Sequence, residues 1–346
     1  MKTRVTFPIF RNTSLLLAWI IVLSVCTLCS AGYADACSVM MKSNQQGTFI
    51  GRTSDFFGPL QTKLEIIPRG FKEHDSITNF SWKVKYGTVG IIDFNLLYDG
   101  INEKGLSAHI LLQEDCKLPP LVPNKQTISF SWAKYILTTC ADVKEAVANL
   151  QNYQVKFDAI VYEGKEVPGM LPHLAVFDPS GDAAIIEFND GKVQVFHGPQ
   201  YNVMTNAPKL PDQLANLEKV RSDKIQFSIA QLPGGADAKA RFVRATFNME
   251  KMPEPASATQ AVIFMEEAIN NIAVPAYDDK TNPDSPFLSD AWETRWRVVY
   301  DLKNMHMFFD YDQTGKKVYL KIEDALFEGK TIKYIDPTKT KSPFEL

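Results

Sequence analysis

Short apolar runs separated by turn residues fill the segment from residue 37 to residue 113. Runs of about four to eight residues rich in β-branched and aromatic side chains are typical of strands. The runs that fit this description are 38–41, 48–52, 63–67, 89–94 and 107–112. The segment is therefore predicted to be strand-rich.

The pattern then changes twice along the chain. Apolar residues recur at helical spacing between 128 and 150, where Asp142 is positioned to start a second helix. Turn residues at 178–182 and 189–191 divide the block 174–197 into three strands of a meander. Helical patterns follow at 210–229, 236–248 and 259–272, and strand patterns at 295–301, 306–311 and 317–322. Strands at both ends with helices between them predict an α+β domain whose sheets combine early and late segments.

The first 36 residues have the layout of a secretory signal peptide. Lys2, Arg4 and Arg11 precede an uncharged apolar run at 15–28, and the small residues around Ala34-Asp35-Ala36 suit a signal peptidase. An uncleaved anchor is the alternative, but the run is short for a spanning helix. The sequence predicts a signal peptide at 1–36 that is removed, and a single domain at 37–346 in the periplasm or outside the cell.

Charge and cysteine content narrow the class of protein. Three basic residues and one acidic residue leave with the peptide, so the net charge changes from −3 to −5. This mild acidity without a basic cluster predicts no nucleic-acid partner, and no membrane association is expected once the signal is gone. Cys37, Cys116 and Cys140 remain. Either Cys116 and Cys140 form a disulfide and leave Cys37 free, or both are unpaired.

Cleavage after Ala36 would make Cys37 the first residue of the mature chain. Cys37 would then carry both a thiol and a free α-amine, whose ordinary pKa values are about 8.5 and about 8. The amine can take the thiol proton near neutral pH. One residue would supply nucleophile and base, which is the chemistry of amino-terminal nucleophile enzymes.

The stretch G-R-T-S-D-F at 51–56 lies where a hairpin would return the chain to Cys37. An Arg52 cation near the sulfur favours the thiolate, and an Asp55 carboxylate holds an ammonium group and raises its basicity. The alternative is an ordinary surface ion pair between the two side chains.

These stretches resemble the choloylglycine hydrolase and penicillin V acylase family of amino-terminal nucleophile hydrolases. The resemblance begins with C-S-V-M at a processed terminus, followed by G-R-T-S-D-F. Three further stretches agree in order: D-G-I-N-E-K-G-L at 99–106, T-N-A-P at 205–208, and G-G at 234–235 with R-F-V-R at 241–244. The match extends from residue 37 to about residue 322.

The resemblance implies a role for each matched residue. Cys37 would be the nucleophile and its amine the base, with Arg52 and Asp55 tuning that terminus. Asn206 would donate its side-chain amide to the oxyanion, and Arg244 would join the charge network near the nucleophile. Taken alone, Asn206 is also a reasonable turn residue and Arg244 a reasonable solvated helix residue. The resemblance further implies a four-layer αββα sandwich, a homotetramer and the exported branch of the family.

One departure concerns the oxyanion hole. Many family members carry an asparagine shortly after N-E-K-G-L, whereas this chain has leucine at the nearest matching position, in the run 107–113. A backbone N–H can serve regardless of the side chain, so the hole can survive. His109 in this run is not assigned as a base, because the amine fills that role and a lone strand histidine usually belongs to the core.

Apolar residues near the motifs form the predicted acyl pocket. The residues assigned to it are Phe56, Phe57, Leu60, Trp82 and Leu112. The alternative is that several of them are plain core residues. No cofactor is expected. No metal site is predicted, because no two of the five histidines have ligand spacing on one helix, and the chain has no phosphate-binding glycine loop.

The predicted reaction is hydrolysis of a linear carboxamide through a Cys37 thioester. Family analogy offers penicillin V, N-acyl homoserine lactones and conjugated bile salts, and an exported enzyme with an aromatic pocket favours the first two. One alternative is a periplasmic lipoprotein acylated at Cys37, although Ala34 and Asp35 suit a lipobox poorly. Another is a relative without hydrolase activity that only binds acyl amides.

Overall fold

The structure, a computed structural model, describes residues 37–56, 58–158, 160–162, 165–167, 171–222, 227–276, 292–312 and 314–339. All of them belong to one unit, Ala34–Leu346. Within these ranges no helix has both the length and the apolar character needed to cross a membrane.

One sheet is built around the hairpin that follows Cys37. Its six strands are antiparallel and lie in the order β16-β1-β2-β17-β18-β19. Their bounds are Ser38–Asn44 (β1), Gly47–Asp55 (β2), Val203–Thr205 (β16), Thr294–Asp301 (β17), His306–Tyr311 (β18) and Lys316–Lys321 (β19). In the hairpin Val39 lies opposite Arg52. The predicted return of the second strand to Cys37 is confirmed.

A second antiparallel sheet has eight strands in the order β15-β14-β13-β8-β7-β6-β3-β20. Their bounds are Lys63–Ile67 (β3), Thr88–Asp93 (β6), Leu96–Asn102 (β7), Ser107–Gln113 (β8), Leu171–Phe177 (β13), Ala183–Asn189 (β14), Lys192–His197 (β15) and Lys333–Ile335 (β20). Both faces of β6, β8 and β14 are buried. This sheet is therefore covered on both sides.

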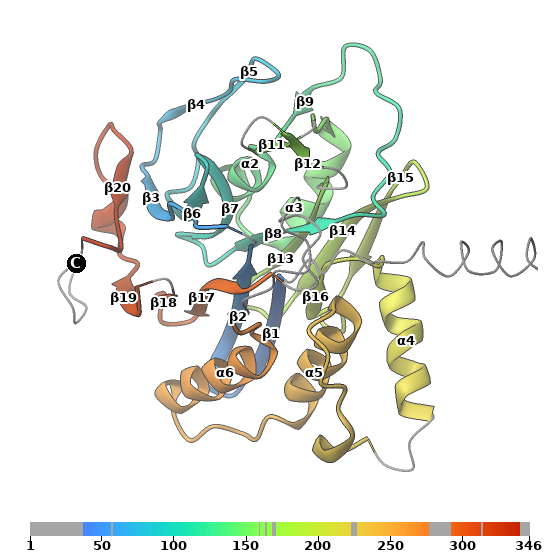
Figure 1. Cartoon of the computed structure of the whole chain (residues 1–346). Helices are drawn as coiled ribbons and strands as arrows, with labels where there is room; N and C mark the ends of the chain where they lie inside the picture. Colours follow the sequence, from blue (N-terminus) through green and yellow to red (C-terminus); the bar gives the residue numbers. More distant parts are fainter. Residues whose placement is uncertain are drawn as a thin grey trace, which may run out of the picture. The chain divides into compact units, whose positions relative to one another are not determined.

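The helices form the two outer layers. Their bounds are Trp132–Thr139 (α2), Val143–Asn149 (α3), Leu210–Ser222 (α4), Ala238–Lys251 (α5) and Ala258–Ile272 (α6). Helices α2 and α3 pack on the eight-stranded sheet, and α5 and α6 pack on the six-stranded sheet (Figure 1). Asp142 caps α3 by accepting a hydrogen bond from the backbone N–H of Glu145, as its predicted helix start requires. The result is the expected four-layer αββα sandwich.

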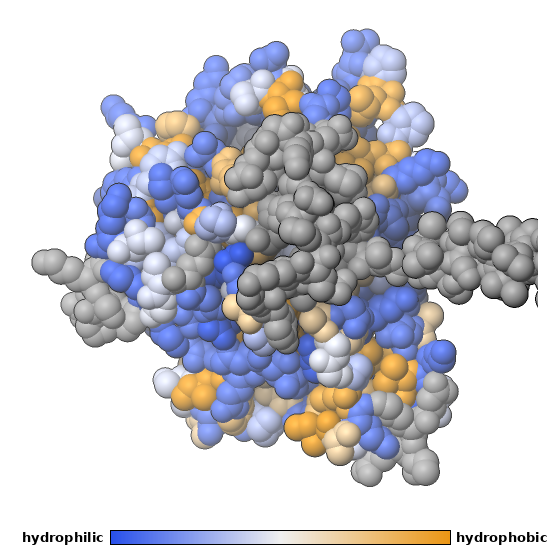
Figure 2. All heavy atoms as spheres, in the orientation of Figure 1, coloured by the Kyte–Doolittle hydropathy of each residue, from blue (hydrophilic) through white to orange (hydrophobic). Residues whose placement is uncertain are grey.

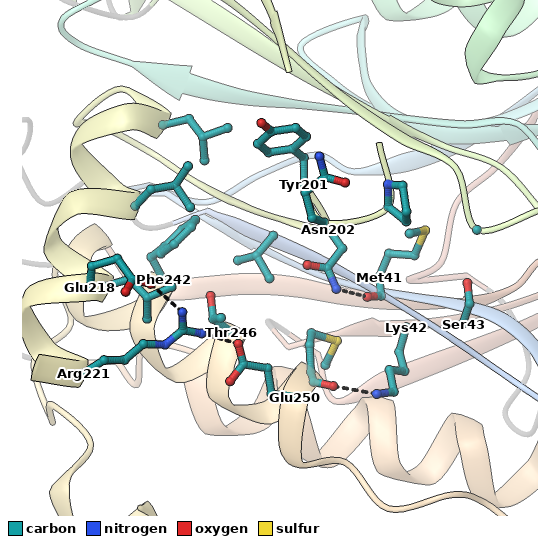
Figure 3. Close-up of a pocket in the computed structure, with 18 residues that line it drawn as sticks. Met41, Lys42, Ser43, Tyr201, Asn202, Glu218, Arg221, Phe242, Thr246 and Glu250 are labelled. Carbon is teal, nitrogen blue, oxygen red and sulfur yellow. Dashed lines mark hydrogen bonds and ion pairs between the residues drawn. The ribbon is translucent and has the colours of Figure 1, made fainter. Parts of the chain in front are cut away.

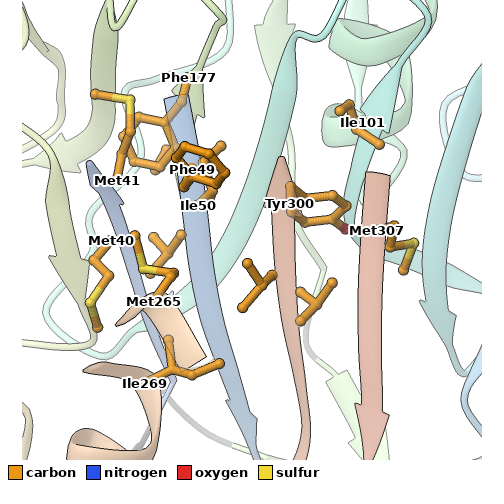
Figure 4. Packing of buried hydrophobic residues seen from close by; sticks show 14 of the residues in the cluster. Met40, Met41, Phe49, Ile50, Ile101, Phe177, Met265, Ile269, Tyr300 and Met307 are labelled. Carbon is orange, nitrogen blue, oxygen red and sulfur yellow. The ribbon is translucent and has the colours of Figure 1, made fainter. Parts of the chain in front are cut away.

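Two apolar layers hold the sandwich together. The larger one joins the two sheets and also lies beneath α5 and α6; Figure 4 shows Met265 and Ile269 of α6 beside Met40 of β1. The smaller one fills the space between the eight-stranded sheet and α2 with α3. Burial of apolar surface on this scale is the main favourable contribution to folding.

Gly51 lets α6 approach the nucleophile hairpin. A Cβ atom at this position of β2 would lie 2.4 Å from Cγ2 of Ile269 and 2.8 Å from Sδ of Met265. Real Cβ contacts are not this short, so any larger residue would push β2 and α6 apart.

Most predicted elements are confirmed, but several were missed. The two-stranded sheets β4 (Lys72–Asp75) with β5 (Phe80–Lys83), β9 (Thr127–Ile128) with β10 (Gln154–Val155), and β11 (Ile160–Tyr162) with β12 (Lys165–Val167) were not predicted. β7, β16 and β20 were missed as well. Charged and polar residues in β4 and β7 weaken the strand pattern. Of the helix predicted over 210–229, the described helical part is Leu210–Ser222; residues 227–228 are not helical, and a 3₁₀ turn occupies Ile229–Gln231. Further 3₁₀ turns lie at Leu150–Asn152 and Asp324–Phe327.

The described surface on the face seen in Figure 2 is mostly hydrophilic, with apolar residues in small separate groups. Single exposed apolar residues such as Ile229 and Val122 are ordinary for a folded protein. This face therefore offers no large apolar binding surface among the described residues, and we expect catalytic residues in the interior.

Candidate active site

Cys37 is buried at the start of β1, which is an interior strand of its sheet. β1 pairs with β2 on one side and with β16 on the other, so Cys37 lies between the ends of two neighbouring strands. Its Sγ atom is 3.7 Å from the carbonyl oxygen of Asp55. Burial raises the pKa of the Cys37 thiol, and the guanidinium group of Arg52 opposes that rise. A thiolate here therefore depends on its cationic neighbours.

Asp55 ends β2 beside Cys37. Its carboxylate accepts hydrogen bonds from the hydroxyl groups of Thr294, at 2.5 Å, and Thr53, at 3.4 Å. Burial raises the pKa of Asp55 to about 7, and the strongest opposing influence is the Arg241 guanidinium. A carboxyl group that titrates near neutrality beside a chain terminus can hold an ammonium group or exchange a proton with it.

Arg52 crosses from β2 to the opposite sheet. Nη1 donates to the carbonyl oxygen of Tyr98, at 2.8 Å, and to Oδ2 of Asp99, at 2.7 Å. Nη2 donates to the carbonyl oxygen of Ile110 at 2.7 Å. The guanidinium also lies 5.1 Å from the centre of the Trp296 ring. Arg52 is thus a buried cation paired with Asp99, and the alternative of a surface ion pair is wrong.

Asn206 follows β16 and faces β8. Its Nδ2 donates to the carbonyl oxygen of Leu112 at 2.7 Å, and its Oδ1 accepts from Nη2 of Arg241 at 3.4 Å. These contacts fix which end of the amide is the donor. Since Nδ2 carries two hydrogens, one remains without a protein acceptor in the described part of the chain. That hydrogen is available to an oxyanion.

Arg241, rather than Arg244, contacts the nucleophile. The guanidinium of Arg241 donates to the carbonyl oxygen of Cys37 at 2.7 Å and to the hydroxyl of Ser38. Arg244 instead donates at 2.7 Å to the carbonyl oxygens of Pro233 and Gly235. The two arginines lie one turn apart on α5, so spacing alone could not choose between them. The predicted place of Arg244 in the charge network near Cys37 is therefore corrected to Arg241.

Two residues predicted for the acyl pocket, Phe56 and Leu112, adjoin this site, and a third, Leu60, is a core residue. Phe56 directly follows Asp55 and its ring centre is 5.7 Å from both the Trp292 and the Phe94 ring centres. Leu60 is buried in the apolar layer between the sheets. Leu112 supplies the carbonyl oxygen that holds Asn206. An aromatic cluster therefore adjoins the end of β2.

Trp82 lies elsewhere. Its indole donates to the hydroxyl of Thr138 on α2 at 2.9 Å and contacts the rings of Phe80 and Tyr135. These contacts belong to the outer side of the eight-stranded sheet, so its assignment to the acyl pocket is not supported. The prediction for Phe57 falls outside the described residues.

A separate cavity of about 550 Å³ adjoins the other end of β1 (Figure 3). Met41, Lys42 and Ser43 line it together with residues of α4 and α5, and Cys37 is not among its lining residues. Arg221 at its rim pairs with both Glu218 and Glu250. Its cation is thereby neutralised, whereas the ammonium group of Lys42, which also lines the cavity, donates to the carbonyl oxygen of Met249 at 2.7 Å.

In the described part of the chain, the remaining cysteines and acidic groups form neither a disulfide nor a metal-binding cluster. Cys116 and Cys140 are both free thiols, so the structure does not contain the disulfide that was one of the two alternatives. Among the residues that the structure describes, no three His, Cys, Asp or Glu side chains are grouped as a metal site would require.

The arrangement at the start of β1 suits attack on a carbonyl group. A thiol is buried beside two guanidinium groups, which favour its anionic form. An oriented amide N–H lies across the strand end and can stabilise a developing oxyanion. A carboxyl group that titrates near neutral pH completes the set.

Comparison with known proteins gives a consistent result. The family model described as "Linear amide C-N hydrolases, choloylglycine hydrolase family" matches residues 37–324. The penicillin V acylase of Pectobacterium atrosepticum is 34% identical over 284 residues, which cover 75% of this chain and 73% of that protein. The penicillin V acylase of Agrobacterium tumefaciens is similar in structure, with a TM-score of 0.74, 30% identity, and coverage of 87% of this chain and 91% of that one. A mutant of the conjugated bile acid hydrolase of Clostridium perfringens shares the fold at a TM-score of 0.73 and 19% identity, over 90% of this chain and 98% of that one.

Proposed function

The chain belongs to the choloylglycine hydrolase family of linear amide C–N hydrolases, and on that premise we propose that it cleaves an acyl amide through a thioester on Cys37. The observation that carries this proposal is the convergence of Arg52, Asp55, Asn206 and Arg241 on the start of β1. The enzyme class follows from the family, whereas the nucleophile and the substrate are our proposal.

The first half of the reaction forms the thioester. The α-amine of a chain that begins at Cys37 takes the thiol proton, and the sulfur attacks the carbonyl carbon of the substrate amide. The resulting oxyanion accepts the spare N–H of Asn206. The C–N bond then breaks, and the ammonium group of Cys37 gives its proton to the departing amine.

The second half releases the acid. Water loses a proton to the same amine and attacks the thioester carbonyl. The tetrahedral intermediate is again stabilised by Asn206, and the C–S bond breaks as the sulfur regains its proton. Asp55, whose pKa burial raises to about 7, would hold the terminal ammonium group in place between the two halves.

An aromatic acyl group is the substrate part that we propose for this site. The ring of Phe56, next to Asp55, contacts the rings of Trp292 and Phe94, and aromatic rings favour flat or apolar acyl groups. The two relatives named as penicillin V acylases support a phenoxyacetyl amide, that is, penicillin V. N-acyl homoserine lactones are a second candidate because their acyl chains are apolar. Conjugated bile salts are the alternative, and they rest on a neighbour that shares the fold alone.

Removal of residues 1–36 during export is the activation step in this proposal, because only cleavage after Ala36 exposes the amine. A lipoprotein is the competing possibility, and it is chemically exclusive, since lipidation would occupy both the amine and the sulfur of Cys37. The intact mass of the exported protein decides between them: added acyl chains on the mature form would refute the hydrolase.

A substrate panel tests the activity. The chain beginning at Cys37 is assayed with penicillin V, acyl homoserine lactones and conjugated bile salts, with amine release as the readout. Matched controls are Cys37→Ser and a chain that begins at Ala34, which retains the thiol but has no amine on Cys37. We expect turnover of penicillin V by the first form and loss of turnover in both controls. Absence of turnover on all three classes of substrate would refute the proposed function, and turnover by the Ala34 form would refute the role of the amine.

A further inference from the structure

Asp99, on β7, accepts hydrogen bonds from three side chains that come from both sheets. The donors are Nη1 of Arg52 on β2, at 2.7 Å, Nδ1 of His109 on β8, at 2.5 Å, and the hydroxyl of Tyr300 on β17. All four side chains are at most 1% exposed. A carboxylate this deeply buried is stable only where donors satisfy it, and here three donors do so.

Arg52 connects this cluster to the nucleophile. It belongs to the strand that pairs with the one following Cys37, but every hydrogen bond of its Nη atoms goes to the opposite sheet. Two acceptors are backbone carbonyl groups, and the third, Asp99, is the acceptor that carries charge. Asp99 is therefore the partner that compensates the buried guanidinium.

We propose that Asp99, held by His109 and Tyr300, is a positioning residue that fixes the Arg52 guanidinium beside the Cys37 sulfur. No feature of the reaction described above requires Asp99 or His109 to touch the substrate. The inference rests on the proposed role of Cys37 as nucleophile, and it adds residues that act on the nucleophile through Arg52.

His109 is oriented for this task. Its second ring nitrogen, Nε2, lies 3.0 Å from the hydroxyl of Ser107, and that hydroxyl can donate to the carbonyl oxygen of Phe177 at 3.2 Å. Because Ser107 contacts Nε2, the other ring nitrogen, Nδ1, is directed at Asp99. Contacts at both ring nitrogens thus fix the orientation of His109. The Asp99 carboxylate cannot rotate away from Arg52 without losing its hydrogen bond to His109.

Other titratable groups lie close to Arg52 from further elements. Asp93 on β6 accepts from the indole N–H of Trp296 at 3.1 Å, and burial raises its pKa to about 6. Burial raises the pKa of Tyr98 on β7 as well. The charges of Asp55 and Arg241 also influence the pKa of the Cys37 thiol, the first raising it and the second lowering it. Any change measured at Cys37 must therefore be separated from the titration of these groups.

Position and charge predict opposite shifts, which makes the proposal testable. If Asp99 only neutralised Arg52, its removal would strengthen the cation and lower the pKa of the Cys37 thiol. If Asp99 holds Arg52 in place, its removal lets the cation move and raises that pKa. A close cation shifts the pKa of a neighbouring acid by about 1 to 3 units.

The experiment compares Asp99→Ala with Asp99→Asn in the mature enzyme. Asn keeps an oxygen that can accept from both Arg52 and His109, whereas Ala removes the acceptor. Asp178→Asn is the matched control, because Asp178 is a buried carboxylate that accepts a hydrogen bond from the backbone N–H of Val143 on α3 and has no part in the Asp99 cluster. The readouts are kcat, KM and the pH midpoint of Cys37 alkylation by iodoacetamide, followed on the peptide that contains Cys37.

For Asp99→Ala we expect kcat to fall about 10-fold or more, KM to stay within about two-fold, and the alkylation midpoint to rise by about one unit. Asp99→Asn should recover most of kcat, and Asp178→Asn should match the wild type. An unchanged midpoint in Asp99→Ala, or equal downward shifts in both Asp99 variants, would overturn the proposal.

A second pair covers the case in which Asp99→Ala does not fold. His109→Asn places an amide N–H near the position of Nδ1, and His109→Ala does not, so Asn should retain the midpoint and Ala should raise it. Equal midpoints in the two variants would overturn the proposal. Alkylation needs no substrate, so it tests the positioning role of Asp99 even if the wild type hydrolyses no acyl amide. Failure of this proposal can therefore be told apart from failure of the proposed hydrolase function.

Discussion

Replacement of Arg241 by lysine tests the corrected assignment on α5. Arg241 is fully buried and donates to the carbonyl oxygens of Ala236 and Cys37, the hydroxyl of Ser38 and Oδ1 of Asn206. Lysine keeps the positive charge near Asp55 but carries its donors on one nitrogen. It cannot reach all four acceptors, and we expect it to lose the 3.4 Å contact with Asn206, which is the longest of the four. Among the described residues, the side-chain amide of Asn206 is then held only by the carbonyl oxygen of Leu112.

The expected loss can be estimated from the role of that amide. One oxyanion donor contributes about 10²–10³ in kcat, or about 3–4 kcal/mol. Because Arg241→Lys leaves the donor in place but with one of its two orienting contacts removed, we expect kcat to fall about 30- to 100-fold, with KM little changed. The loss of charge-assisted hydrogen bonds should also lower the free energy of unfolding by about 1.5–3 kcal/mol.

Arg244→Lys is the matched control. Arg244 bonds only backbone carbonyl groups among the partners seen here, at Asn271, Pro233 and Gly235. This variant should lose a similar amount of stability, yet its kcat should remain within about three-fold of the wild type. Steady-state kinetics and urea unfolding of both variants provide the comparison. A larger loss of kcat in Arg244→Lys than in Arg241→Lys would refute the reasoning.

Three further changes probe the site and its support. Asn206→Ala should lower kcat by about 10²–10³-fold. Asn202→Ala is the control, because it also removes a side-chain amide bonded to a backbone carbonyl, and it should leave kcat unchanged. Comparable kcat values for the two variants would contradict the oxyanion role. The second change concerns Asp55 in a chain that begins at Ala34, where burial raises the pKa of this carboxyl group from its ordinary 3.8 to about 7. Between these two values the folded state keeps a proton that the unfolded state releases. The free energy of unfolding should therefore fall as the pH rises from 4 to 7. Asp55→Asn should weaken that fall, and urea unfolding at pH 4 and pH 8 would show an undiminished fall if the carboxyl is not responsible. Gly51→Ala should lower the free energy of unfolding by about 1–3 kcal/mol, measured by urea unfolding, because the added Cβ would collide with α6; unchanged stability would show that the helix can move aside.

The sequence predicted the frame of the molecule well because its strands and turns carry local signals. The β1–β2 hairpin, the meander of β13 to β15 and the cap at Asp142 all rest on contacts within a few residues. β7 was missed because Asp99 and Asn102, both buried, interrupt its apolar pattern. Their burial depends on partners from distant segments, such as Arg52 and the carbonyl oxygen of Leu137.

The candidate site was predicted in part for the same reason. Cys37, Arg52 and Asp55 belong to one hairpin, so local pairing brings them together. The choice between Arg241 and Arg244 depends on how α5 is rotated against β1, which spacing along the helix does not specify. Trp82 was misplaced because an aromatic residue in a loop-like run has no local signal for which face of a sheet it covers.

The ion cluster around Asp99 restricts how this protein can be stabilised. Replacing a buried ion pair by well-packed apolar residues is often neutral or stabilising, by about 1–4 kcal/mol in favourable cases. Here the same cluster joins the two sheets. It also contains Arg52, the cation that lowers the pKa of the Cys37 thiol most strongly. An apolar core at this position would therefore remove one of the two guanidinium groups that favour the Cys37 thiolate. Gains in thermal stability have to be sought in the layers beneath the helices, away from the space between the sheets.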